Sequence, residues 1–80
     1  MDFNTFVVSL ARTAAVHFGD IADADGAKQP ADLLGASQII DVLALLEEKT
    51  RGNLSAEERQ ILEQVLYELR LRFLQAQKNV

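Results

Sequence analysis

Apolar residues recur at helical spacing in three separate segments of the chain. In the first segment they fall at three- and four-residue steps from Phe3 to Phe18, with polar residues between them. Asp2 or Asn4 offers a side-chain oxygen as the N-cap, and Gly19 suits the left-handed conformation that ends many helices. The pattern therefore predicts an amphipathic N-terminal helix over about residues 3–18.

Two further helices are predicted on either side of Gly52. Residues 33–50 repeat the same apolar spacing, and Gly52 follows them as a stop signal. Ser55 and Glu58 match the capping box that begins a helix, here over about residues 56–77. Because the link is short, the two helices are expected to lie side by side and antiparallel. The predicted fold class is all-α, three helices, with this antiparallel helical hairpin and the N-terminal helix.

The third predicted helix is apolar on two sides. Its wide face consists of Ile61, Leu62, Val65, Leu66, Leu69 and Phe73. Tyr67, Leu71 and Leu74 fall on nearly the opposite side, and Arg70 lies beside them. A helix that is apolar on two sides is usually sandwiched between neighbours. Since the other two helices cover one side, these four residues are interface candidates, as Tyr and Arg are enriched at binding hot spots. For Tyr67 and Arg70 the alternative is that they cover apolar neighbours of their own chain.

The small size of the chain points to self-association as a source of stability. Eighty residues predict a single domain over residues 1–80, and such a domain buries only about 60% of the surface of its unfolded chain. The chain has no cysteine for a disulfide, and one histidine without cysteine argues against structural zinc. Association with another copy or another protein is the remaining route.

Charge and hydropathy argue against several kinds of partner. A net charge of −4 and a pI near 4.7 oppose binding to a phosphate backbone, so no nucleic-acid partner is expected. The run Val42 to Leu46 is far shorter than the roughly 20 apolar residues of a membrane span. The N-terminus lacks the basic and apolar regions of a secretory signal. We expect a cytoplasmic protein that does not contact the membrane.

An acidic motif lies between the first two predicted helices. Asp23-Ala24-Asp25-Gly26 resembles the middle of a calcium-binding EF-hand loop, with Asp32 in the position of the last ligand. Ile21 occupies the place of the first acidic ligand, and Asp-x-Asp-Gly is also common turn chemistry. We interpret the motif as a turn and expect no metal or cofactor. A metal- or ligand-binding regulator that uses these acids is a less favoured alternative.

The sequence contains no pattern that indicates catalysis. His17 falls in the last turn of the first helix, where the helix dipole favours it, and no acid or nucleophile stands beside it in sequence. Gly-rich phosphate loops and nucleophile elbows are absent. Glu68 and Arg72 have the spacing of a surface ion pair. We therefore expect that the protein is not an enzyme.

Three stretches resemble one known family, the domain of unknown function 1844. They are the opening Phe3-x-x-Phe6-x-x-Ser9-Leu10, the run Tyr67-Glu68-Leu69-Arg70, and the corner Lys49-Thr50-Arg51-Gly52-Asn53-Leu54. The resemblance implies a bacterial source and a short helical protein without an established activity. It implies no catalytic or binding residue.

The leading hypothesis is a non-catalytic helical protein that self-associates and acts as a scaffold or regulatory partner. Tyr67, Leu71, Leu74 and Arg70 would lie at the interface, because their side of the third helix has no covering element in the chain. The main alternative is an accessory subunit whose apolar stripe is covered by a different protein.

Overall fold

The protein is built from three α-helices, seen in a computed structural model that describes residues 1–23, 25–28 and 30–78. The helices are α1 at Phe3–Phe18, α2 at Leu33–Lys49 and α3 at Ala56–Lys78. No strand occurs in the described ranges. The all-α prediction is confirmed, and each observed end lies within one residue of the predicted one.

The first helix begins and ends at the predicted signals. The carboxylate of Asp2 accepts a hydrogen bond from the backbone N–H of Thr5 at 2.7 Å. Gly19 has a φ of 80°, and its N–H donates to the carbonyl of Val16. A residue with a β-carbon is strained at such an angle, so glycine permits the chain to leave the helix there.

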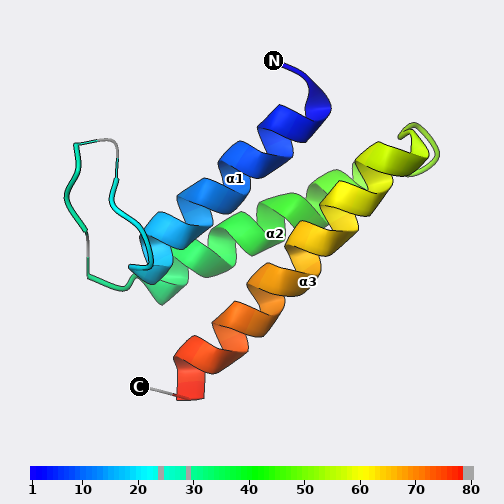
Figure 1. The fold of residues 1–80 in the computed structure, drawn as a ribbon. Helices are drawn as coiled ribbons and strands as arrows, with labels where there is room; N and C mark the ends of the chain where they lie inside the picture. Colours follow the sequence, from blue (N-terminus) through cyan, green and yellow to red (C-terminus); the bar gives the residue numbers. More distant parts are fainter. Residues whose placement is uncertain (24, 29, 79–80) are drawn as a thin grey trace.

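The corner between α2 and α3 is built by the predicted capping box. The N–H of Glu58 donates to the Ser55 hydroxyl at 3.1 Å, and the N–H of Ser55 donates to the Glu58 carboxylate at 2.9 Å. Gly52, with a φ of 85°, reverses the chain directly before this box. These contacts satisfy N–H groups that the first turn of a helix leaves unpaired. Figure 1 shows the result, two helices that run in opposite directions from a tight corner.

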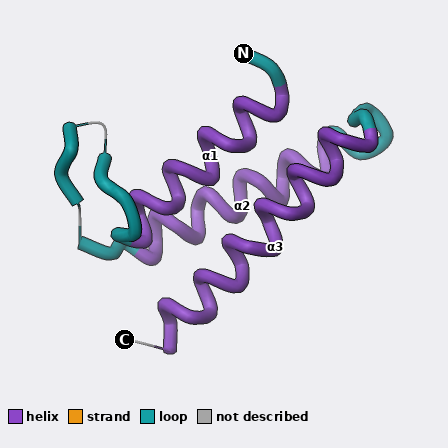
Figure 2. Tube along the Cα trace, viewed as in Figure 1, coloured by secondary structure: helices purple, strands orange, loops and turns teal. Residues whose placement is uncertain are grey.

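All three helices contact one another. α1 and α2 run side by side in opposite directions, and α3 returns from the corner at an angle to α2, as Figures 1 and 2 show. The Cα positions extend over 37 × 28 × 16 Å, so the molecule is flat. A flat arrangement leaves a large share of each helix at the surface.

The core lies where the three helices meet. Its buried side chains are Val7, Ala14 and Phe18 of α1, Ala36 and Leu43 of α2, and Leu62, Leu66 and Leu69 of α3. They come from the positions that the apolar spacing assigned to inner faces. Leu66, for example, is 1% exposed, although the next residue, Tyr67, is 67% exposed. The core therefore fixes which side of α3 points outward.

Candidate functional site

The four predicted interface residues lie together on the outer side of α3. Tyr67, Leu71 and Leu74 are 67%, 45% and 54% exposed, and Arg70 is exposed beside them. At about 100° per residue, the three apolar side chains fall within a narrow arc on the side opposite the core. We call Tyr67, Leu71 and Leu74 the α3 stripe. Its exposure in a single chain agrees with the excess apolar surface that the sequence indicated.

Two grooves border the α3 stripe on the side of α2. The first groove is lined by Glu47, Glu63, Leu66, Tyr67, Arg70, Leu71 and Leu74. The second is lined by Ser37, Ile40, Asp41, Arg70, Phe73 and Leu74. Both grooves include Arg70 and Leu74 in their lining, so these two side chains lie where the grooves adjoin. An exposed apolar patch with a polar edge is typical of protein interaction sites.

Three charged side chains in the first groove have no partner within the described part of the chain. Glu47 of α2, Glu63 and Arg70 form no ion pair or side-chain hydrogen bond there. Glu47 is half-buried, whereas Glu63 and Arg70 are exposed. Spacing along the chain does not indicate that Glu47 lies near Glu63, because their proximity depends on how α2 packs against α3. Only Glu63 is on α3, so only its position relative to the α3 stripe can be read from the helical repeat.

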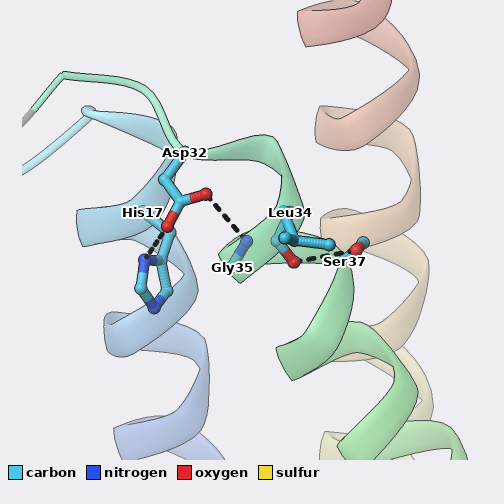
Figure 3. Close-up of polar contacts among 5 residues, drawn as sticks. All are labelled: His17, Asp32, Leu34, Gly35 and Ser37. Carbon is cyan, nitrogen blue, oxygen red and sulfur yellow. Dashed lines mark hydrogen bonds and ion pairs between the residues drawn. The ribbon is translucent and has the colours of Figure 1, made fainter.

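His17 and Asp32 meet where α1 ends and α2 begins. Figure 3 shows the Nδ1 atom of His17 facing the Oδ2 atom of Asp32, at a distance of 3.5 Å. The other carboxylate oxygen of Asp32 accepts a hydrogen bond from the N–H of Gly35 at 3.0 Å and caps α2. The N–H of Asp32 donates to the carbonyl of His17 at 2.6 Å. The sequence analysis placed no acid beside His17, and the fold supplies one.

The His17–Asp32 pair lies where α1 and α2 pack closely against each other. The Ser37 hydroxyl, also drawn in Figure 3, donates to the carbonyl of Leu34 at 2.9 Å. A β-carbon on Gly35 would lie 2.6 Å from the Asp32 carboxylate and 2.7 Å from the imidazole. Glycine at this position thus permits α1 and α2 to approach closely at their joined ends.

The carboxylate of Asp23 binds the backbone of the predicted turn. The Oδ1 atom of Asp23 accepts hydrogen bonds from the N–H groups of Asp25 and Ala27, at 3.0 and 3.1 Å. Gly26 has a φ of 82°, as turn chemistry requires, and Ala24 lies outside the described residues. Asp32 is engaged as the cap of α2. Over the described ranges, no group of three or more potential metal ligands occurs.

A long-range ion pair joins the loop after α1 to α3. Arg72 donates two hydrogen bonds to Asp20, at 2.8 and 2.7 Å, and its guanidinium lies 5.0 Å above the Phe18 ring. The predicted surface pair between Glu68 and Arg72 is wrong, because Arg72 turns to Asp20 and Glu68 accepts a hydrogen bond from Gln64. The Arg72 guanidinium lowers the pKa of Asp20 below its ordinary value by stabilising the carboxylate.

Among the described residues, no helix is long and apolar enough to cross a membrane.

A family model described as "Domain of unknown function (DUF1844)" matches residues 1–75 of the chain. No curated protein and no solved structure matches this chain. The matched range includes the whole α3 stripe and Arg70.

Proposed function

The chain belongs to the DUF1844 family, and from this premise we propose a non-catalytic helical protein that self-associates through the α3 stripe and acts as a scaffold or regulatory partner. The observation that carries the proposal is the joint exposure of Tyr67, Leu71 and Leu74 along the groove that these three residues line. The family description names no activity, so the surface of this chain is the basis for the proposal.

The size of the stripe supports association of moderate strength. Fully burying one large apolar side chain is worth about 1.5–3 kcal/mol relative to leaving it exposed. Each of the three side chains is roughly half exposed, so covering them on two copies contributes on the order of 6 kcal/mol. Bringing two proteins together costs an estimated 4–15 kcal/mol. The apolar stripe therefore offsets a large part of this cost, and polar groups at its edge decide the affinity.

The carboxylate and hydroxyl groups that could take part in catalysis are hydrogen-bonded to backbone groups, which supports a non-catalytic protein. The carboxylate of Asp32 caps α2 while it faces His17, and the hydroxyls of Ser37 and Ser55 are engaged with backbone groups. An acyl-transfer or hydrolytic site needs a nucleophile within hydrogen-bond distance of a base. These residues perform structural tasks instead.

The proposal places the protein in the bacterial cytoplasm, with a protein as its partner. The net charge of −4 disfavours nucleic acid, because phosphate backbones attract basic surfaces. The absence of cysteine suits a reducing compartment.

Sedimentation velocity over a range of concentrations tests the proposal. We expect the wild-type chain to sediment as an assembly at high concentration and to dissociate on dilution. Leu71→Asp places a charge in the stripe and should leave a folded monomer at concentrations where the wild type is assembled. Leu45→Asp is the matched control, because Leu45 is a 54% exposed leucine of α2 that lines neither groove.

A wild-type chain that stays monomeric at every concentration would contradict self-association. Isolation of the monomer from its native cell with a stoichiometric foreign protein on the α3 stripe would then favour an accessory subunit. An assembly that Leu45→Asp disrupts as strongly as Leu71→Asp would place the interface elsewhere.

A further inference from the structure

Asp25 is the only aspartate or asparagine in the sequence that is followed by glycine. Its side chain forms no hydrogen bond or ion pair within the described part of the chain, and both Asp25 and Gly26 are exposed. A β-carbon added to Gly26 would meet nothing within 4 Å, so this side of the peptide link faces open space. The Asp25 carboxyl group is therefore free to approach the backbone nitrogen of Gly26.

Other aspartates of the chain are held in place. Asp2 and Asp32 cap α1 and α2 with their carboxylates. Asp20 is bound by the Arg72 guanidinium, and Asp41 lies inside α2, where the helix uses the backbone N–H groups. Each of these aspartates is followed by a residue with a side chain that crowds the next backbone nitrogen. Asp25 has neither restraint.

The reaction that this pair permits is closure of a five-membered ring. The Gly26 nitrogen attacks the Cγ atom of Asp25, and a bond from nitrogen to Cγ forms while the C–OH bond of the protonated carboxyl breaks. The proton of the nitrogen leaves with this hydroxyl as water. The product is a cyclic imide between Asp25 and Gly26, and no electrons are gained or lost.

Water then opens the cyclic imide in one of two ways. Cleavage of the bond from nitrogen to Cγ restores aspartate. Cleavage of the bond from nitrogen to the backbone carbonyl carbon leaves the chain running through the Cβ atom, which is isoaspartate. The overall change is an isomerisation, so water is the only co-reactant.

We infer that Asp25 converts spontaneously to isoaspartate through this ring, and that the turn around Asp23 limits the rate. The N–H of Gly26 donates to the carbonyl of Asp23 at 3.0 Å, and the Oδ1 atom of Asp23 accepts from the N–H groups of Asp25 and Ala27. Ring closure requires the Gly26 nitrogen to leave its hydrogen bond. The turn must therefore open first, and exposed loops open at a low free-energy cost.

Both ends of the loop are fastened outside the reacting pair. Asp20 binds Arg72 of α3, and the N–H of Asp32 donates to the carbonyl of His17 at 2.6 Å. Isoaspartate adds one carbon atom to the backbone between these two anchors. The helices and the core keep their contacts when Asp25 has reacted, so the altered chain persists as folded protein. The inference concerns the loop and does not depend on the α3 stripe.

Peptide mapping of the full-length chain during incubation at neutral pH tests the inference. Trypsin releases the peptide of residues 13–28, which contains Asp20 and Asp23 beside Asp25. Electron-transfer fragmentation identifies which residue has become isoaspartate. We expect the isoaspartate fraction to rise with time at Asp25 and to stay at the level of the unincubated sample at Asp20 and Asp23. Circular dichroism of the incubated chain should show unchanged helix content.

Three variants separate the chemistry from the turn. Asp25→Glu keeps the charge and the glycine but would require a six-membered ring, so the product should fall to background. Asp25→Asn forms the same five-membered ring with loss of ammonia and should react faster, which makes it the positive control. Asp23→Ala removes the Oδ1 acceptor and should accelerate the reaction of Asp25, provided that circular dichroism shows the chain to be folded.

Two results would overturn the reactive site. One is a wild-type chain whose Asp25 stays unmodified over a period in which Asp25→Asn reacts, and the other is equal formation of isoaspartate at Asp20 and Asp25. An equal rate in Asp23→Ala and the wild type would overturn the control by the turn. Self-association through the α3 stripe is tested separately by sedimentation, so either proposal can fail without the other.

Discussion

Arg72 donates two hydrogen bonds to the carboxylate of Asp20, a residue 52 positions earlier in the chain. The pair fastens the segment that follows α1 to the outer flank of α3. Arg72 also covers the Phe18 ring, one of the buried residues of the core. The contact therefore ties together two elements that the short helix corner does not connect.

Asp20→Asn should destabilise the protein at neutral pH and make little difference in acid. The two side chains are 41% and 33% exposed, so solvent screening limits the pair to about 0.5–1 kcal/mol. The pKa of Asp20 is lower in the folded protein than its ordinary value of 3.8. Its contribution is therefore present above pH 3.8 and is lost as the pH falls through the lowered pKa. Urea unfolding of both proteins from pH 7 to acid measures the difference.

Asp25→Asn is the control for this series, because the Asp25 side chain forms no hydrogen bond within the described residues. It should have little effect on the free energy of unfolding at any pH. A destabilisation by Asp20→Asn that persists unchanged in strong acid would show that the carboxylate charge is not its cause.

Gly35→Ala should lower the free energy of unfolding by roughly 1 kcal/mol, although alanine is the better helix former by about the same amount. The new β-carbon meets the Asp32 carboxylate at 2.6 Å and the His17 ring at 2.7 Å. Relieving both contacts disturbs the cap of α2, and loss of such a cap costs about 0.5–2 kcal/mol. Thermal or urea unfolding measures the net change.

The His17→Ala background separates the two causes. Two of the three nearest atoms to the added β-carbon belong to the His17 ring, so Gly35→Ala should cost less once the ring is removed. An equal cost in both backgrounds would mean that the clash with His17 is not responsible.

Local signals in the sequence predict local structure well in this chain. The Asp2 cap and the Ser55–Glu58 box depend on residues three apart, and both are confirmed. Leu66 is buried and Tyr67 is exposed because successive residues of an α-helix lie about 100° apart around its axis. These features need no knowledge of how the helices pack.

Contacts between helices were not predictable from the spacing of residues. The helical repeat favoured Arg72 with Glu68, but packing brings Asp20 within reach and the guanidinium binds it in two places. Asp32 lies beside His17 because α2 returns along α1. Glu47 lines the groove beside α3 because α2 packs against α3. The charges of the candidate site thus required the three-dimensional arrangement.

Leu62→Ala and Leu71→Ala should separate the core from the interface. Leu62 is fully buried, and removal of such a side chain costs about 2–5 kcal/mol. Leu71 is 45% exposed, so its truncation should cost about 1 kcal/mol or less in chemical unfolding of the dilute, dissociated chain. At high concentration the cost of Leu71→Ala should grow, since the assembly stabilises the folded state. A cost independent of concentration would contradict an interface at Leu71.

Tyr67 is the single tyrosine of a chain without tryptophan, so intrinsic fluorescence reports on the centre of the α3 stripe. Acrylamide quenching of this fluorescence over a dilution series tests the central claim most directly. The account predicts that Tyr67 is shielded from the quencher at high protein concentration and becomes fully accessible on dilution, in step with the fall in sedimenting mass from the assembly to one chain of 8.9 kDa. Quenching that is equally strong at every concentration, while the chain remains assembled, would show that the stripe stays in water and would contradict it.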